Sequence, residues 1–145
     1  MRIWNVHPMY LDDNRLLQEH RCIHNIIQSI TAAVNHKIKK FYYCAGYVAY
    51  RHYLLASELR IRGMYHESFI DKEYGKIPIR RRTFDYLLTP LMVIKDATEL
   101  KKRWSAESSN KRPTARVTMR SVPMDMLEGL EKLKRNGLPK DVFLV

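Results

Sequence analysis

Residues 1–25 read MRIWNVHPMYLDDNRLLQEHRCIHN, and the organisation of the rest of the chain follows from them. Residues 1–11 are partly apolar and are predicted to be extended. Pro8 interrupts any regular helix at this point and biases His7 toward extended backbone. A segment without a regular helix is therefore predicted to precede the first helix of the chain.

A long helix is predicted to begin at Asp12 or Asp13, which are suitable N-caps, and to end near Asn35 or His36. At helical spacing one face carries apolar side chains, namely Leu16, Ile23, Ile27, Ile30 and Val34. The opposite face carries Arg15, Gln18, Arg21, Cys22, Asn25 and Ser29. Glu19 falls at the margin of the apolar face. The apolar face is predicted to pack in a core, and the polar face is the candidate for function.

A second helix is predicted from about Tyr42 to Arg62, with Gly63 as its C-terminal stop. Aromatic and apolar side chains recur along it at helical spacing, namely Tyr43, Tyr47, Tyr50 and Leu54. Such a stripe packs in a core more often than it stacks on bases, so a core role is favoured and base stacking is the alternative.

Residues 64–82, which hold a glycine and a proline, are predicted to form a loop. Three segments follow: a third helix from Thr89 or Pro90 to Trp104, a polar basic loop over 105–121, and a short last helix between Pro123 and Gly137. The predicted fold is all-α, a compact single domain over residues 1–145 with three main helices and a short C-terminal one.

The charge is unusual, because 26 Lys+Arg stand against 15 Asp+Glu and give a formal net charge of +11. This excess favours a polyanionic partner, and double-stranded DNA is the first candidate. Three basic clusters are predicted to share a phosphate-binding face, with plain solvated surface as the alternative: Arg80–Arg82, Lys101–Arg103 and Lys111–Arg112. A membrane surface is a weaker candidate, since no long amphipathic segment sets basic residues opposite large apolar ones.

Two cysteines, Cys22 and Cys44, are too few for a disulfide framework. The sequence shows no signal peptide, and no apolar run approaches the roughly 18 residues of a membrane span. A cytoplasmic protein is predicted, or a viral protein that acts in the host cytoplasm, and a monomer is expected. The P-loop, GxGxxG, HExxH and CxxC motifs are absent from the sequence.

His20 and His24 are spaced i, i+4, lie on one flank of the first helix, and could begin a metal site. No third ligand with suggestive spacing accompanies them. A structural or DNA-contacting role is therefore favoured over metal binding, and no metal is predicted.

The amino terminus is a candidate nucleophile. Arg2 is large, so removal of the initiator is disfavoured and Met1 is expected to keep its α-amine. An α-amine has an ordinary pKa of about 7.7–8.0, so an appreciable fraction is neutral at pH 7. A neutral amine can attack an electrophilic sugar carbon and form an imine.

Two stretches, MRIW at residues 1–4 and LLQEHRCIH at residues 16–24, together resemble the pyrimidine-dimer DNA glycosylase family, the phage endonuclease V type and its bacterial relatives. The matching positions are Met1, Arg2, Ile3, Trp4, Leu16, Leu17, Glu19, His20, Arg21 and His24. Residues 50–71, YRHYLLASELRIRGMYHESFID, are similar to the family's second helix, and Arg112-Pro113-Thr114 is a weaker likeness. The resemblance covers residues 1–80 and extends loosely over the remainder.

The resemblance implies an all-helical domain that binds UV-damaged duplex DNA, flips a base and cleaves the glycosyl bond of a pyrimidine dimer. The α-amine of Met1 would attack C1′ to give an imine, and β-elimination would then break the strand, with no metal or organic cofactor. By position, Arg2, Arg15 and Arg21 would contact phosphates or the damaged site. The other candidate DNA contacts are His20, His24, Lys101, Lys102 and Arg112.

The chain departs from the family at one position, because the essential glutamate after the helix arginine is Cys22 here. Three hypotheses follow. A Cys22 thiolate, with its pKa lowered by Arg15 and Arg21, takes over part of the glutamate's role. Glu19, one turn earlier, supplies the carboxylate instead. Or base excision is lost, and either a DNA-binding protein or a lyase acting at abasic sites is left. A non-catalytic DNA-binding module is the competing hypothesis, and an RNA-associated basic protein is a third alternative.

Overall fold

The computed structural model describes residues 2–35, 45–64, 66, 68–77, 90–107, 115–116 and 135–136. Its elements are the 3-10 turn η1 (Pro8–Tyr10) and the helices α1 (Asp13–Asn35), α2 (Ala45–Ile61), α3 (Asp71–Gly75) and α4 (Pro90–Ala106). No strand occurs within these residues. The all-α prediction is therefore confirmed. No helix among the described residues is long and apolar enough to cross a membrane.

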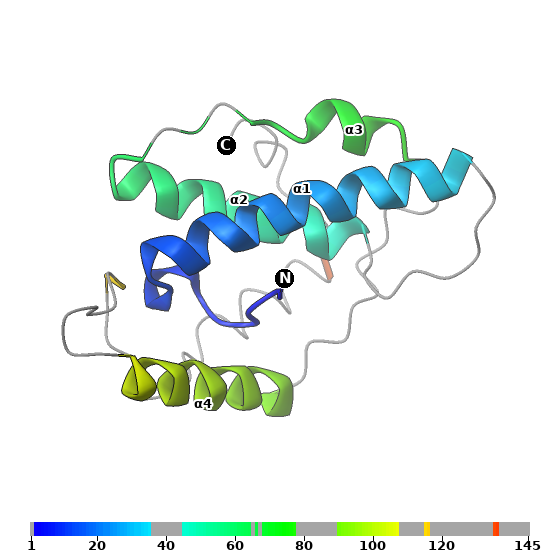
Figure 1. The fold of residues 1–145 in the computed structure, drawn as a ribbon. Helices are drawn as coiled ribbons and strands as arrows, with labels where there is room; N and C mark the ends of the chain where they lie inside the picture. The colour runs from blue at the N-terminus through cyan, green and yellow to red at the C-terminus, as the bar shows by residue number, and fades with distance from the viewer. Residues whose placement is uncertain are drawn as a thin grey trace.

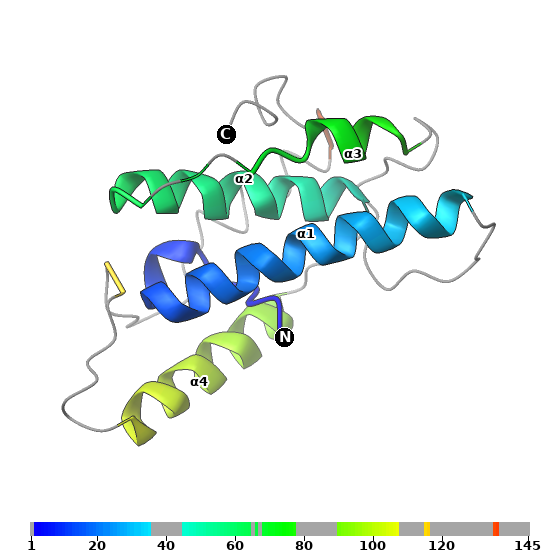
Figure 2. The same cartoon turned by 45° about the horizontal axis from the view of Figure 1, so that its top comes forward.

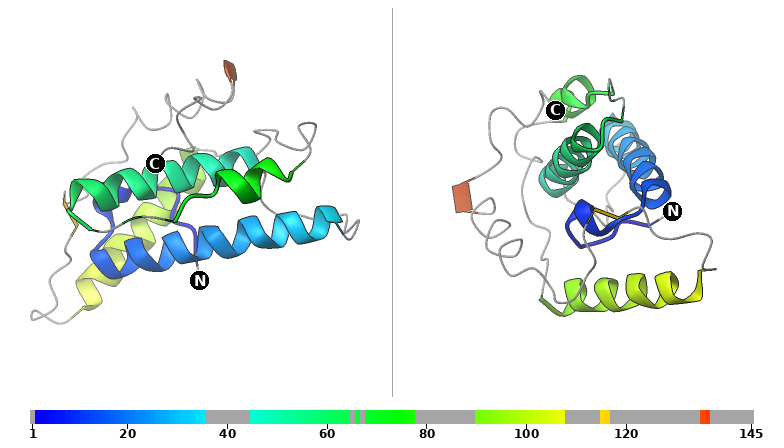
Figure 3. Two further views of the ribbon diagram at one scale, coloured as in Figure 1. Left: turned by 90° about the horizontal axis from the view of Figure 1, so that it is seen from above. Right: turned by 90° about the vertical axis from the view of Figure 1, so that its left-hand side faces the viewer.

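The helices α1 and α2 lie side by side and run in opposite directions (Figure 1). Residues 2–11, the amino-terminal arm, lie between this pair and α4 (Figures 2 and 3). The short α3 packs against α1 on the side away from α4. The arm is thus enclosed by helices that come from distant parts of the chain.

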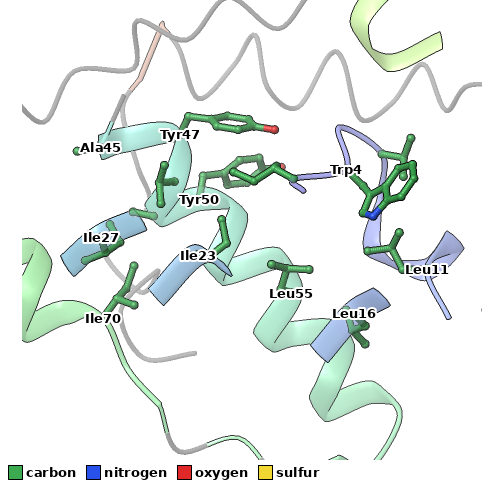
Figure 4. Packing of buried hydrophobic residues seen from close by; sticks show 14 of the residues in the cluster. Trp4, Leu11, Leu16, Ile23, Ile27, Ala45, Tyr47, Tyr50, Leu55 and Ile70 are labelled. Atoms are coloured by element: carbon green, nitrogen blue, oxygen red, sulfur yellow. The ribbon is translucent and has the colours of Figure 1, made fainter. Parts of the chain in front are cut away.

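The core forms where the apolar face of α1 meets α2 and the arm (Figure 4). The predicted stripe of α1 is buried at Leu16, Ile23, Ile27 and Ile30. On α2, Tyr47 and Tyr50 are buried as well, so the predicted core role is confirmed for these two. Leu54 is half-buried against the core, and Tyr43 lies outside the described residues. The helix α2 buries most of its circumference, because α1 and the arm both pack on it.

Gly63 ends α2 as predicted. Its φ of 71° lies in the left-handed region that favours glycine. The Gly63 N–H donates to the Arg60 carbonyl (2.9 Å), and the Met64 N–H donates to the Leu59 carbonyl (2.8 Å). These two bonds make a Schellman motif, which satisfies carbonyls that the helix end leaves free.

Two short elements correct the sequence prediction. The arm contains η1, where the His7 Nδ1 accepts a hydrogen bond from the Met9 N–H (3.1 Å), so residues 1–11 are not extended throughout. Pro8 does hold His7 in extended backbone, with φ −60° and ψ 136°. The predicted loop 64–82 contains α3, which forms because the Tyr74 side chain is buried against the core.

The other boundaries agree with the sequence within a few residues where they are described. The helix α1 matches its prediction, and α4 runs two residues past Trp104. The predicted start of α2 falls outside the described residues. Of the predicted last helix only Arg135 and Asn136 are described, and both are helical.

Candidate functional site

The start of the arm is attached to α4 through the buried carboxylate of Asp96. One of its oxygens accepts hydrogen bonds from the Asn5 backbone N–H (3.1 Å) and from Asn5 Nδ2 (2.7 Å). The other pairs with the Arg2 guanidinium, which also lies over the Trp4 ring, 4.3 Å from its centroid. The Tyr47 hydroxyl of α2 donates to Asn5 Oδ1 (2.6 Å). Two helices therefore fix the same residue of the arm.

The middle of the arm lies on a buried ion pair between α1 and α2. Arg51 donates from Nε to Glu19 Oε1 (2.5 Å) and from Nη2 to Glu19 Oε2 (3.0 Å), and its Nη1 donates to the Val6 carbonyl (2.5 Å). The backbone N–H of Trp4 is a further donor to the Glu19 carboxylate. Burial raises the pKa of Glu19, and the Arg51 guanidinium opposes that shift. Both side chains are at most 2% exposed, so neither charge is available to a partner outside the protein.

The end of the arm is held by Arg62, just past α2. Its Nη2 donates to the carbonyls of Pro8 (3.1 Å) and Leu11 (2.6 Å). Its Nη1 pairs with Asp13 (2.8 Å) and its Nε with Glu58 (3.0 Å). Together, Asp96, Arg51 and Arg62 anchor the arm along its whole described length.

These anchors were not found from the sequence. Asn5, Arg51, Arg62 and Asp96 are polar residues within apolar or mixed stretches, and nothing in their spacing shows that they meet around residues 2–11. One signal was present: Arg51 and Glu58 lie within a helix that is otherwise apolar or aromatic on most sides. A charge in such a place is usually buried only with a partner.

Cys22, at the family's glutamate position, is buried with 7% exposure. Burial, and then the nearby Glu19 carboxylate, raise the pKa of its thiol. The two arginines expected to lower that pKa are placed elsewhere, since Arg15 pairs with Asp12 and Glu107, and Arg21 is exposed. This direction does not favour the thiolate hypothesis, which stays a prediction.

The predicted DNA contacts divide into three groups. Arg21, Lys101 and Lys102 are exposed and available to a partner. Arg2 and Arg15 are ion-paired within the protein, and His20 is buried with 9% exposure, which does not fit a phosphate contact. His24 is half-buried, and Arg112 lies outside the described residues, as do the proposed nucleophile Met1 and the clusters Arg80–Arg82 and Lys111–Arg112.

His20 and His24 of α1 meet two further histidines, His52 of α2 and His66 from the segment between α2 and α3. These four residues are called the histidine cluster below. Their Nε2 atoms face one another: the distances are 3.2 Å for His20–His52, 3.3 Å for His20–His24, 3.2 Å for His24–His52 and 3.0 Å for His20–His66. Four nitrogen ligands from three segments converge on one point. The sequence showed only the pair on α1, because His52 and His66 reach it through the tertiary fold.

The imidazoles of the histidine cluster are neutral at pH 7. Burial lowers the pKa of His52 to about 2 and that of His20 to about 4, and the neighbouring histidines add to both shifts. Burial also lowers the pKa of His24 and of His66. Each ring therefore has one bare nitrogen with a lone pair available.

The fold and site define an all-α protein built on an antiparallel helix pair, with an amino-terminal arm anchored by buried charges. The family model described as pyrimidine dimer DNA glycosylase matches residues 1–72, which include the arm, α1, α2 and the histidine cluster. Over these residues the chain belongs to the pyrimidine dimer DNA glycosylase family. Membership implies DNA repair of the glycosylase type and a DNA substrate. No curated protein and no solved structure matches the chain.

Proposed function

We propose that the protein is a DNA-repair lyase that acts at abasic sites in duplex DNA. The neutral α-amine of Met1 attacks C1′ of the ring-opened deoxyribose, water leaves, and an imine forms. Loss of a C2′ proton then drives β-elimination, in which the C3′–O bond breaks and the 3′ phosphate leaves with the electron pair. Hydrolysis of the imine returns the free amine.

The observation that carries this proposal is the anchoring of the amino-terminal arm. From Arg2 to Leu11, the residues next to the proposed nucleophile are held by buried or ion-paired groups of α1, α2 and α4. Catalysis by a positioned nucleophile requires such a rigid support, because a misplacement of about 1 Å costs roughly 100-fold in rate. The three anchors supply such a support to the residues beside the proposed nucleophile.

Lyase action is proposed rather than excision of an intact base because neither Glu19 nor Cys22 is suited to replace the family's glutamate. Glu19 is committed to Arg51 and to the Trp4 N–H, and it is 1% exposed. Cys22 is a neutral thiol and cannot stabilise a cationic sugar as a carboxylate does. Imine formation at an existing abasic aldehyde needs chiefly the amine, so this step survives the substitution.

The electrostatics of the chain support a duplex DNA partner. The net charge is +11, and the exposed Arg21, Lys101 and Lys102 are free to contact phosphates. Lys101 and Lys102 lie on α4, the helix that also holds Arg2 through Asp96. Phosphate contacts from α4 would thus be coupled mechanically to the position of the arm.

The test is borohydride trapping of the imine on two duplexes, one with a thymine dimer and one with a single abasic site. The wild type is compared with a Cys22→Glu variant and with protein whose amino terminus is blocked. Mass spectrometry first confirms that Met1 is the amino terminus. We expect the wild type to trap on the abasic duplex only, blocking to abolish trapping, and Cys22→Glu to gain trapping on the dimer.

Other outcomes overturn the proposal in distinct ways. Trapping of the wild type on the dimer would show that base excision proceeds without the family's glutamate. No trapping on either duplex, with salt-sensitive binding retained, would leave a DNA-binding relative without catalysis. Preference for structured RNA and indifference to the abasic site would favour the RNA-binding class. Circular dichroism of each variant excludes loss of fold as the cause.

A further inference from the structure

The nitrogen atoms of the histidine cluster cannot be satisfied by hydrogen bonds among themselves. A neutral imidazole has one donor nitrogen and one acceptor nitrogen. The Nε2 atoms of His20, His24 and His52 form a triangle with sides of 3.2–3.3 Å. Every side would need one protonated and one bare nitrogen, and three corners cannot alternate between two states. At least one side therefore sets two lone pairs, or two N–H groups, against each other.

A fourth ring adds to this mismatch. His66 Nε2 lies 3.0 Å from His20 Nε2, which already has two imidazole neighbours. An imidazole Nε2 atom donates or accepts one hydrogen bond in the plane of its ring. His20 Nε2 has three close nitrogen neighbours and can form a hydrogen bond with only one of them. Direct hydrogen bonding does not account for the arrangement.

A cation at the centre of the histidine cluster resolves the mismatch, because all four lone pairs can then point at it. A tetrahedral zinc ion holds nitrogen ligands at about 2.0–2.1 Å, which separates the ligand atoms by about 3.3–3.4 Å. In the structure, four of the nitrogen pairs are 3.0–3.3 Å apart. All four ligand atoms lie within 4.8 Å of one another. Four of the six nitrogen pairs thus already have about the spacing that zinc requires, and the other two lie within 4.8 Å.

The geometry points to a structural Zn²⁺ site formed by the Nε2 atoms of His20, His24, His52 and His66. Imidazole is a ligand for several transition metals, and a tetrahedral set of four neutral nitrogens suits Zn²⁺ best among the common ones. Four protein ligands complete the tetrahedron and leave no open position for water or substrate. The site therefore supports the fold and does not take part in the reaction at the arm.

The proposed zinc ion would link three segments of the chain. His20 and His24 belong to α1, His52 to α2, and His66 to the segment that leads to α3. The ion would tie these three pieces together. It would also stiffen α1 at His20, directly after the Glu19 that holds the arm.

The outer shell of the site is sparse. Zinc-bound histidines usually donate their other ring nitrogen to a carboxylate, a carbonyl or water, and loss of such a partner costs about 10–100-fold in metal affinity. His52 Nδ1 and His66 Nδ1 are buried without a partner. The Ser68 carbonyl lies 3.0 Å from His52 Nε2 and accepts a hydrogen bond from this nitrogen in the tautomer that carries its proton there. The expected affinity is therefore lower than that of zinc sites with a full outer shell.

The test uses the full chain without a polyhistidine tag, because a tag would itself bind metal. Metal is removed with a chelator, and Zn²⁺ is titrated back in competition with a chromophoric chelator. Co²⁺ substitution then reports the coordination geometry through its visible absorption. We expect one equivalent of Zn²⁺, an intense tetrahedral Co²⁺ spectrum without a thiolate charge-transfer band, and a lower melting temperature after chelation.

The variants separate this site from surface binding. His66→Ala and His52→Ala should each weaken Zn²⁺ binding by more than about 10-fold, since loss of a ligand exceeds loss of an outer partner. The matched control is His7→Asn, which removes an imidazole outside the histidine cluster and keeps a side-chain acceptor at the η1 cap. It should leave affinity unchanged. If an alanine variant does not fold, the Co²⁺ spectrum and the chelator shift of the wild type decide alone.

Three results would overturn the proposal. An octahedral Co²⁺ spectrum would mean that the four imidazoles do not surround the ion. Equal Zn²⁺ affinity in the wild type and in a folded His66→Ala variant would place the metal elsewhere. Absence of Zn²⁺ binding to the wild type would mean that the histidine cluster is a packing feature alone.

Discussion

Glu19 and His20 are neighbours on α1, and each leads into a different buried polar cluster. The Glu19 side, toward the arm, joins a carboxylate to the Arg51 guanidinium and to the Trp4 N–H, so every charged atom has a partner of opposite character. The His20 side brings four like imidazoles together, and their close Nε2 atoms cannot all be paired by hydrogen bonds with one another. The first cluster is complete within the chain, and the second would be completed by the proposed ion. A buried polar group without a partner thus indicates a ligand more strongly than a buried charge that has one.

The largest expected effect comes from breaking the complete cluster. Glu19→Gln leaves the Arg51 guanidinium buried without a counter-charge, so the free energy of unfolding should fall by about 3–5 kcal/mol. Urea denaturation measures it. The control is Glu99→Gln, which breaks the exposed i,i+4 pair with Arg103 and should lower the free energy of unfolding far less. Equal losses in the two variants would refute the distinction between buried and exposed pairs.

The second prediction concerns the incomplete cluster and rests on the proposed zinc site. Without metal, His52→Leu should change stability little, because removal of the buried Nδ1, which has no partner, offsets loss of the contact between Nε2 and the Ser68 carbonyl. At a free Zn²⁺ concentration about 100 times the Kd, only the wild type should gain, by about 2.7 kcal/mol. Thermal denaturation with and without Zn²⁺ measures both states. A large loss in the metal-free variant would mean that the imidazoles stabilise the fold by themselves.

The third prediction concerns a variant that weakens the anchoring of the arm and leaves both Glu19 and Arg51 in place. Asp96→Asn removes the charge that binds Arg2 and replaces an acceptor of Asn5 by an amide. The rate of imine trapping on the abasic duplex should fall by about 10–100-fold, because the amine is less well positioned. Duplex affinity should stay within about twofold, since the exposed cations proposed to contact phosphates are unchanged. A parallel loss of affinity would mean that Asp96 supports the DNA-binding surface itself.

The fourth prediction is a pH dependence at the far end of the arm. The guanidinium groups of Arg116 and Arg62 outweigh burial and hold the pKa of Glu58 below its usual value. A lowered pKa in the folded state contributes stability above the unfolded pKa, and this contribution is lost as pH falls through the folded pKa. Unfolding free energies between pH 7 and pH 3 should therefore decline less steeply for Glu58→Gln than for the wild type. Parallel curves would show that this carboxylate is not linked to folding.

The smallest expected effect concerns a single surface cation. Lys102→Ala removes an exposed charge from α4 and should lower the slope of log affinity against log salt by about 1 if Lys102 contacts a phosphate. Binding to duplexes of different sequence should weaken equally. The matched control is Lys72→Ala on α3, away from α4, which should leave the slope unchanged. An effect of equal size in the control would indicate a diffuse field in place of a defined face.

The sequence by itself determined the helical framework and the family. The apolar stripe of α1 and the glycine that ends α2 are local signals, because helical periodicity and a left-handed backbone are properties of a few consecutive residues. The two motifs around Arg2 and His20 identified the family for the same reason: they are read along the chain.

Only the tertiary structure decided what the polar residues do. Whether Glu19 is a catalytic carboxylate or a buried anchor depends on Arg51, which lies 32 residues away in the chain. Whether His20 and His24 meet DNA or a metal depends on His52 and His66, brought in by the packing of α2 and of the segment after it. Charge and coordination act through space over a few ångströms, so residue spacing in the sequence cannot show which side chains will share a site.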